Sequence, residues 1–163
     1  MSRKLRFIGS DLNKVDTKGR VSIPADFRRV LCEGDPDYRE GENQPKLVIV
    51  YGDYRRNYLE CFTIQAIEEI YDRIETFPRG DKRRKVLEQM YSTNAMTLSV
   101  DETGRLVLPA KLRNKIDLDG SAFFAGKVDQ FEIWKPETYN EHHGIGLEAD
   151  DDFDPDLDPS AYL

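Results

Sequence analysis

Asp101-Glu-Thr-Gly-Arg-Leu-Val-Leu-Pro-Ala-Lys-Leu-Arg113 is the stretch that decides the fold, because the chain contains it twice. Residues 16–28 read Asp-Thr-Lys-Gly-Arg-Val-Ser-Ile-Pro-Ala-Asp-Phe-Arg, and an offset of 85 residues aligns the two copies. Unrelated windows of this length share about one residue, whereas these copies share six, so the sequence indicates an internal repeat. The identical pairs are Asp16/Asp101, Gly19/Gly104, Arg20/Arg105, Pro24/Pro109, Ala25/Ala110 and Arg28/Arg113.

Each copy predicts a turn, a strand and a helix. Asp and Gly at the first and fourth positions of Asp-x-x-Gly are typical of a type I turn whose Asp side chain accepts backbone hydrogen bonds. Apolar residues alternate in 105–108, as in a half-buried strand, and Pro109 suits the start of a short helix over 110–115. We therefore expect each copy to be a β-hairpin that runs into a helix. The residues expected to brace the turns are Asp16, Gly19, Asp101 and Gly104.

A further strand pair follows each copy. Segments 46–51 and 58–63 have the composition of antiparallel strands, and 122–125 with 131–134 are their equivalents. Glu60 matches Glu132 at an offset of 72, and the longer first loop (33–45) is expected to account for the 13 residues by which the two offsets differ. Between the copies, apolar stripes predict two helices separated by Pro78-Arg-Gly80.

The charge is unevenly distributed along the 163 residues. The net charge is −7, but the nine acidic residues from Glu137 onward, with no Lys or Arg among them, leave the body at +2. A mildly basic body with an acidic tail favours a regulated polyanion binder over an acidic enzyme. The sequence has no phosphate-binding glycine loop, no nucleophile motif and no cluster of metal ligands, and both histidines lie in the tail region. It therefore predicts no enzymatic activity, no cofactor, no metal and no small-molecule substrate.

Cysteine usage and hydropathy point to a compartment. Cys32 and Cys61 form no C-x-x-C pair and follow no secretory signal, so plain thiols in a reducing cytosol are expected. No apolar run reaches the length of a membrane span, and the sequence predicts a soluble protein with no membrane partner.

Two copies of Asp-x-x-Gly-Arg-hydrophobic-x-hydrophobic-Pro, with Phe7-Ile8-Gly9 near the start and 131–134 (Phe-Glu-Ile-Trp) near the end, resemble the MraZ family. The resemblance implies an α+β, mostly β fold with two tandem AbrB-like swapped-hairpin (double-split β-barrel) repeats. The first repeat is expected at 9–66, the linking helices at 67–91 and the second repeat at 92–137. The tail at 138–163 lies outside the resemblance, and its acidic composition without apolar periodicity predicts disorder.

The same resemblance implies a function. It indicates a sequence-specific regulator that binds double-stranded DNA at the promoter of the bacterial division and cell-wall gene cluster. The regulator is expected to act as a ring-shaped homo-oligomer on short direct repeats, in the cytoplasm and associated with the nucleoid. The first copy is expected to be the principal reader, because the second carries Glu102 and Thr103 where the first has Thr17 and Lys18. The candidate DNA-binding residues are Arg3, Arg6, Lys14, Lys18, Arg20 and Arg105.

Other interpretations stay open at this point. Arg20 and Arg105 would lose their DNA role if they only pair with Asp16 and Asp101 to brace the turns. The fold also serves protein-interaction or antitoxin-like modules. A binder of single-stranded RNA is the third alternative, since 51–58 interleaves tyrosines with Arg55 and Arg56, although a hairpin turn with cross-strand tyrosines explains that segment equally well.

Overall fold

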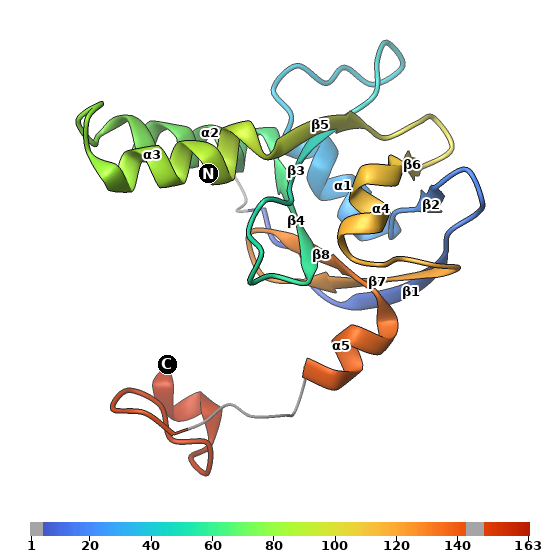
Figure 1. Ribbon diagram of the computed structural model, residues 1–163. Helices are drawn as coiled ribbons and strands as arrows, with labels where there is room; N and C mark the ends of the chain where they lie inside the picture. Colours follow the sequence, from blue (N-terminus) through green and yellow to red (C-terminus); the bar gives the residue numbers. More distant parts are fainter. Residues whose placement is uncertain (1–4, 143–148) are drawn as a thin grey trace.

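The computed structural model describes residues 5–142 and 149–163 and has a mixed α+β fold dominated by antiparallel strands (Figure 1). The strands are β1 (Ser10–Lys14), β2 (Arg20–Ser22), β3 (Lys46–Val50), β4 (Tyr58–Thr63), β5 (Ala95–Ser99), β6 (Arg105–Val107), β7 (Ser121–Gly126) and β8 (Phe131–Trp134). The helices are α1 (Ala25–Glu33), α2 (Ile64–Glu75), α3 (Lys82–Glu88), α4 (Ala110–Lys115) and α5 (Pro136–His142), with a π-helical turn η1 (Gln89–Thr93) and a 3-10 turn η2 (Pro159–Tyr162).

Local sequence signals place several of these elements where they were predicted. The strands at 58–63 and 131–134 and the helix at 110–115 have the predicted bounds. Pro24 and Pro109 directly precede α1 and α4. The side chain of Thr63 caps α2 by accepting from the backbone N–H of Ala66 at 3.0 Å, which satisfies one of the open donors at the helix start.

The two repeats are intertwined. Six strands form one sheet in the order β1-β7-β8-β4-β3-β5, and β2 pairs with β6 in a second, two-stranded sheet. The first strand of each repeat thus pairs with the other repeat, β1 with β7 and β5 with β3. Among the described strands, β1 and β5 are the free edges of the large sheet, which does not close into a barrel.

A pseudo-twofold axis relates the repeats. Val21 lies opposite Leu106 in the small sheet, and Glu60 lies opposite Glu132 in the large one. In each pair, the two residues occupy the same position of the two repeats, at offsets of 85 and 72 residues. An antiparallel pair in which equivalent residues face each other has its twofold axis between them, so one axis passes through the centres of both sheets.

The expected hairpin of each copy needs a correction. Val15 bridges Val21 next to the turn, but β1 and β2 then separate into different sheets, and β5 and β6 do the same. The reason lies in the core. Val21 of the short β2 and Ile23 just after it are each 1% exposed and are buried with Leu106 and Leu108 of the other repeat.

The extra residues of the first repeat are also divided differently from the expectation. Ser10 pairs with Ala125, and Ala95, the equivalent of Ser10, pairs with Val50. Val50 and Ala125 are therefore equivalent positions, so the offset between the repeats has already fallen from 85 to 75 at β3 and β7. The loop after α1 therefore contains ten of the 13 extra residues. The other three lie in the β3–β4 turn, where the offset falls from 75 to 72.

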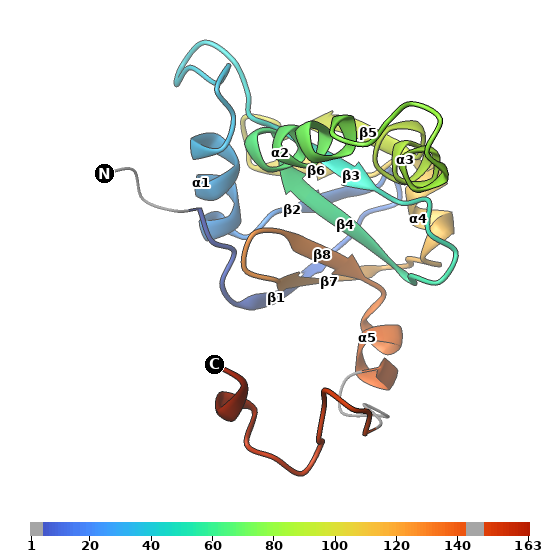
Figure 2. The ribbon, with the colours of Figure 1, turned by 90° about the vertical axis from the view of Figure 1, so that its left-hand side faces the viewer.

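Two apolar clusters hold the fold together. The larger lies between the two sheets and includes Phe7, Phe27 and Phe131, whose ring centroids are 5.0–5.4 Å apart. The smaller lies where α2 and η1 cover β3 and β4 on the outer face of the large sheet (Figure 2). No helix in the described part of the chain is long and apolar enough to cross a bilayer.

The C-terminal region has two parts. Helix α5 continues to His142, beyond the expected start of the tail at 138, and packs Tyr139 on Phe123 with ring centroids 4.1 Å apart. Residues 149–163 fold back on themselves, since Phe153 stacks on Tyr162 and the Tyr162 hydroxyl accepts from the backbone N–H of Asp154 at 2.6 Å. Between the described residues, no hydrogen bond of 149–163 reaches 5–142.

Candidate nucleic-acid interface

The aspartate of each repeated turn organises the backbone around it. The Asp16 carboxylate accepts from the backbone N–H groups of Lys18 and Arg20 at 2.9 Å each, and Gly19 N–H donates to the Asp16 carbonyl at 3.0 Å. The backbone N–H of Arg20, followed by its guanidinium, lowers the pKa of the Asp16 carboxyl. Asp101 holds the second turn in the same way, through the N–H groups of Thr103 and Arg105 at 2.9 Å.

The turn glycines allow the two repeats to approach each other closely. Gly19 and Gly104 have φ of +86° and +81°, a region that favours glycine. The Gly19 carbonyl accepts from Leu108 N–H at 2.8 Å, and the Gly104 carbonyl accepts from Ile23 N–H at 3.0 Å. A Cβ atom on Gly19 would clash with the Leu108 carbonyl. Each turn is therefore fastened to the strand end of the other repeat.

The two repeated helix arginines fasten the same junction. Arg28 donates to the Ile23 carbonyl at 2.8 Å and packs against Gly104, while Arg113 donates to the Leu108 carbonyl at 3.0 Å and packs against Gly19. Sequence reasoning did not assign them this role. The signal was their repetition together with the turn glycines, but only the crossed packing of the repeats explains it.

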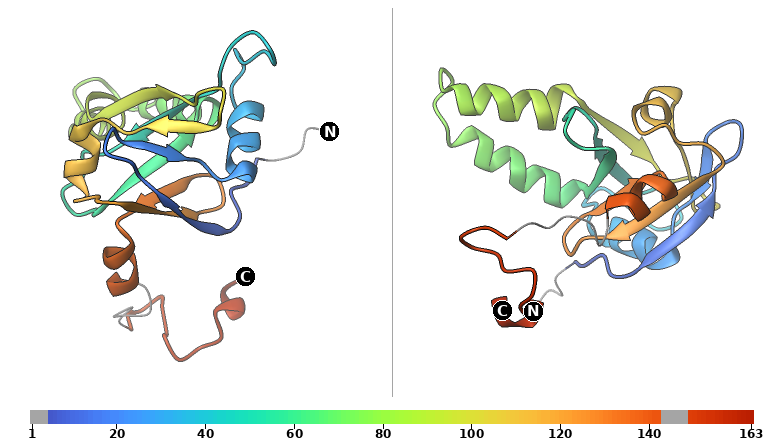
Figure 3. Two further views of the ribbon diagram at one scale, coloured as in Figure 1. Left: turned by 90° about the vertical axis from the view of Figure 1, so that its right-hand side faces the viewer. Right: turned by 60° about the horizontal axis from the view of Figure 1, so that its bottom comes forward.

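The two-stranded sheet presents residues of both repeats on one outward face. Val21 and Leu106 point into the core, so alternation turns the other four residues outward. We call Arg20, Ser22, Arg105 and Val107 the ribbon surface. Ser22 and Val107 are exposed, and the arginine side chains are 39% and 40% exposed. Figure 3 (left) looks onto this sheet, with α4 and α1 on its two sides.

The arginines of the ribbon surface are close neighbours from opposite repeats. Arg20 lies opposite Val107, and Arg105 lies opposite Ser22, which makes the two arginines diagonal neighbours about 7–8 Å apart. The structure thus places Arg105 on the same surface as Arg20, although the sequence indicated a binding surface built mainly from the first copy. Ser22 and Val107 were not among the predicted site residues, although the strand alternation already placed them on the same face as the arginines.

Both arginines also contact the aspartates of their own turns. Arg20 Nε lies 2.6 Å from Asp16 Oδ2, and Arg105 Nε lies 2.9 Å from Thr103 Oγ1 and 3.5 Å from Asp101 Oδ2. Exposed pairs of this kind contribute about 0–1 kcal/mol to stability. Their main effect is to orient the side chains, which stay more than a third exposed.

The other predicted residues are spread along the first strand. Lys14 and Lys18 are exposed on either side of Asp16, next to the ribbon surface. Arg6 precedes β1, whose five residues separate it from the turn by on the order of 16 Å. Its neighbour Phe7 is bridged to Val128 of the β7–β8 turn. Arg3 lies outside the described residues.

The crossed repeats and the arginine-bearing ribbon define a class: a duplicated swapped-hairpin protein whose two halves build one module. A family model described as "MraZ protein, putative antitoxin-like" matches residues 92–144. A Ruegeria sp. (strain TM1040) protein is 57% identical over 155 residues, which cover 92% of each chain, and a Ruegeria pomeroyi protein is 53% identical over 97% of this chain and 95% of its own. A Rickettsia akari protein is 35% identical over 83% of this chain and 85% of its own. All three are named "Transcriptional regulator MraZ". The chain belongs to the MraZ family.

Proposed function

We propose that the chain is a sequence-specific transcriptional regulator that reads double-stranded DNA with its ribbon surface. The observation that carries the proposal is that the crossed repeats bring Arg20 and Arg105 together on one outward-facing two-stranded sheet. The names of the relatives agree with a role in transcription. The unequal charge of the two turns, with Lys18 in one and Glu102 in the other, favours the first copy as the stronger contact.

The chemistry of the ribbon surface suits the major groove. That groove is about 12 Å wide and admits a two-stranded β-ribbon. Arginine pairs bidentately with guanine, serine accepts or donates to a base edge, and an aliphatic side chain such as Val107 contacts the methyl group of thymine. Lys14 and Lys18 lie beside the ribbon, where they neutralise phosphates and make the affinity depend on salt.

The proposal extends to assembly and target. One ribbon surface with two arginines makes few base contacts, so a single copy would bind weakly. Several copies joined in a ring and placed along short direct repeats gain affinity through effective concentration. The family resemblance supports such a ring homo-oligomer, acting in the cytoplasm and on the nucleoid at the promoter of the division and cell-wall gene cluster.

Substitution of the two ribbon arginines tests the reading role. Duplexes selected in vitro by the full-length protein serve as probe. We expect Arg20→Ala to weaken binding by about 1–3 kcal/mol, or roughly five- to 150-fold, and Arg105→Ala to weaken it less. Arg29→Ala is the matched control, because Arg29 also pairs with a carboxylate four residues away, at 3.2 Å and 44% exposure, but lies on α1.

Two outcomes of this experiment contradict the proposal, provided that circular dichroism shows all variants folded. If Arg20→Ala binds as well as Arg29→Ala, the ribbon is not the reading surface. If wild-type protein prefers single strands, or selects no duplex at all, the DNA-reading function fails. Sedimentation tests assembly separately, since the ring requires a mass far above the 18.9 kDa of one chain, and a clean monomer at micromolar concentration rejects it.

A further inference from the structure

The pseudo-twofold axis relates one end of the molecule, formed by α4 and the β3–β4 turn, to the other end, formed by α1 and the β7–β8 turn. The two ends can therefore be compared position by position. The β3–β4 turn (51–57) is three residues longer than its counterpart, the β7–β8 turn (127–130). The helix beside each turn differs as well. Helix α4 carries Lys111 and Lys115 where the equivalent positions of α1 carry Asp26 and the buried Val30.

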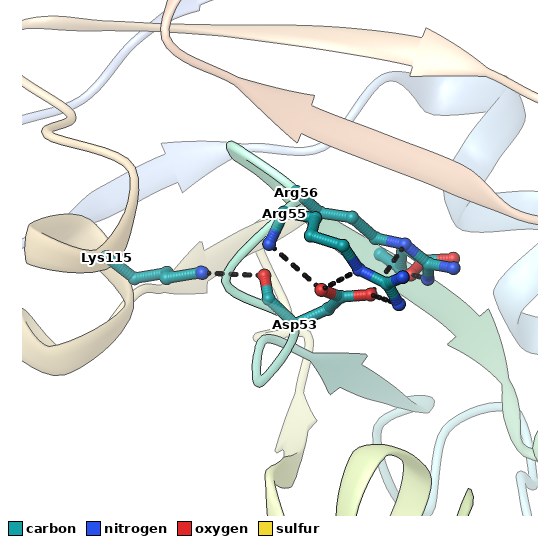
Figure 4. Close-up of polar contacts among 5 residues, drawn as sticks. Asp53, Arg55, Arg56 and Lys115 are labelled. Atoms are coloured by element: carbon teal, nitrogen blue, oxygen red, sulfur yellow. Dashed lines mark hydrogen bonds and ion pairs between the residues drawn. The ribbon is translucent and has the colours of Figure 1, made fainter. Parts of the chain in front are cut away.

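At the α4 end, the longer turn is tied to the helix (Figure 4). Lys115 Nζ donates to the Asp53 carbonyl at 2.9 Å. The Asp53 carboxylate accepts from Arg55 through the backbone N–H, Nε and a terminal guanidinium nitrogen, all at 2.9–3.0 Å. The Arg55 guanidinium, followed by its backbone N–H, lowers the pKa of Asp53 to about 2. The turn is therefore built to hold its arginine in place.

The α4 end is the more basic of the two ends. The β3–β4 turn, α4 and Glu60 hold five cations against two carboxylates, a balance of +3, and the cations are Arg55, Arg56, Lys111, Arg113 and Lys115. Over the equivalent residues the opposite end has three cations against three carboxylates, so its charges cancel, and these residues are Lys127, Arg28, Arg29, Asp26, Asp129 and Glu132. The cations at the α4 end also reach solvent, since the Arg55 side chain is 71% exposed and Lys111 is exposed.

The basic end continues directly from the ribbon surface. Val107 of the ribbon is followed by Leu108 and Pro109, and α4 then starts, so Lys111 lies four residues beyond Val107. Figures 1 and 3 show α4 beside the two-stranded sheet and the β3–β4 turn beyond α4. A duplex seated on the ribbon would extend past its edge on this side toward Lys111 and then Arg55.

We propose that α4 and the β3–β4 turn form a second nucleic-acid contact, which binds the phosphate backbone of duplex DNA on one flank of the sequence read by the ribbon surface. The inference rests on the proposed DNA-reading function and adds a polarity to it. The pseudo-equivalent end, whose charges cancel, makes no such contact. One chain thus distinguishes the two flanks of its site, although its fold is nearly symmetric.

The tyrosines of the turn favour a duplex backbone over a single strand. Stacking along a single strand needs successive open aromatic faces. Lys111 Nζ lies 4.9 Å from the centroid of the Tyr51 ring, and Tyr58 is stacked on Trp134 with centroids 4.5 Å apart. Tyr54, 87% exposed, is the one ring of the three that stays open over most of its surface. One open ring beside fixed cations suits a phosphodiester and its sugar, not a run of bases.

The test compares duplexes that extend a selected core sequence by several base pairs on one flank or on the other. For the wild-type protein, we expect extension on one flank only to raise the affinity by about tenfold at low salt. The slope of log affinity against log salt concentration should also become steeper by about 0.9 for each added phosphate contact. Arg55→Ala/Lys111→Ala should lose this gain and bind the core duplex as the wild type does. Lys127→Ala, at the pseudo-equivalent turn, should keep it.

Four outcomes overturn the inference. They are equal gains on both flanks, an undiminished gain in Arg55→Ala/Lys111→Ala, an equal loss in Lys127→Ala, and tighter binding of single strands that Tyr54→Ala abolishes. Lys111→Gln, which leaves the turn intact, guards against a local folding defect and should lose about half of the gain on a logarithmic scale. Core binding that survives in the flank variants but disappears in Arg20→Ala separates a failure of this contact from a failure of the reading function.

Discussion

Replacing Arg56 by alanine is expected to destabilise the fold at neutral pH, because it removes the cation that pairs with the buried carboxylate of Glu60. Glu60 and Glu132 are 5% and 6% exposed and lie directly opposite each other on the pseudo-twofold axis. Arg56 pairs with Glu60, and Trp134 Nε1 donates to Glu132 at 2.8 Å. Without Arg56, the Glu60 charge would have little access to water and would lie beside a second carboxylate on the cross-strand neighbour, whose Cβ is about 5 Å away.

The magnitude follows from burial. Breaking a fully buried ion pair by removing one partner costs about 3–5 kcal/mol. The Arg56 side chain is 31% exposed, so water compensates part of the loss, and we expect about 2 kcal/mol. For a chain of this size, a loss of about 2 kcal/mol lowers Tm by roughly 4–8 °C.

The stability that Arg56→Ala loses should depend on pH, because it depends on the charge of Glu60. Burial raises the pKa of Glu60, Arg56 opposes the rise, and Glu132 adds to it. A group whose pKa is higher in the folded than in the unfolded state adds stability at low pH, and this stability is lost as the pH rises through the folded pKa. The deficit of Arg56→Ala should therefore shrink between pH 7.5 and pH 5.

Thermal and urea unfolding at both pH values, followed by circular dichroism, measure the effect. Arg56→Ala/Glu60→Gln is the control, because the amide removes the charge that Arg56 compensates, and it should recover most of the lost stability at pH 7.5. If the double variant is as unstable as Arg56→Ala, or if the deficit grows toward pH 5, the charge argument is wrong.

Two further predictions concern the turns and the tail. Gly19→Ala and Gly104→Ala should each lower the free energy of unfolding by about 1–2 kcal/mol, because both positions have positive φ. Gly19→Ala should cost more, because its Cβ would meet the rigid backbone of Leu108. The Cβ of Gly104→Ala would meet only the Arg28 guanidinium, which can move. Chemical denaturation checks the order, and an equal loss would contradict the crossed contact. Removing 143–163 deletes seven carboxylates and should raise affinity for random duplex at low salt more than affinity for a selected site, because exposed carboxylates compete with phosphate only weakly and are screened by salt. Superimposable salt titrations of truncated and full-length protein on random DNA would exclude such competition.

Much of the local structure could be read from the sequence. Residues 58–63 and 110–115 form the predicted strand and helix, because alternation and a preceding proline act over a few residues. The repeat of 16–28 at 101–113 also established the duplication, and with it the family resemblance that the comparisons confirm. These signals depend on neighbouring residues in the chain.

Other features depended on contacts between distant segments. Local patterns predicted that the strands on either side of each turn pair with each other, but β2 pairs with β6 and β1 with β7. The alternating strands need an apolar partner, and a strand of three residues such as β2 cannot identify that partner from its own sequence. The division of the 13 extra residues between two loops followed only from the strand register.

The sequence by itself determined that this chain is a duplicated β-rich protein of the MraZ type, because turn chemistry, alternation and repetition are written in local residue order. Only the tertiary structure decided which residues share a surface. It placed Arg105 beside Arg20 on the ribbon surface, turned Arg28 and Arg113 toward the opposite repeat's turn, and brought Glu60 against Glu132 on the axis. The physical reason is that each half lacks a complete core and buries its apolar strands only by exchanging them with the other half.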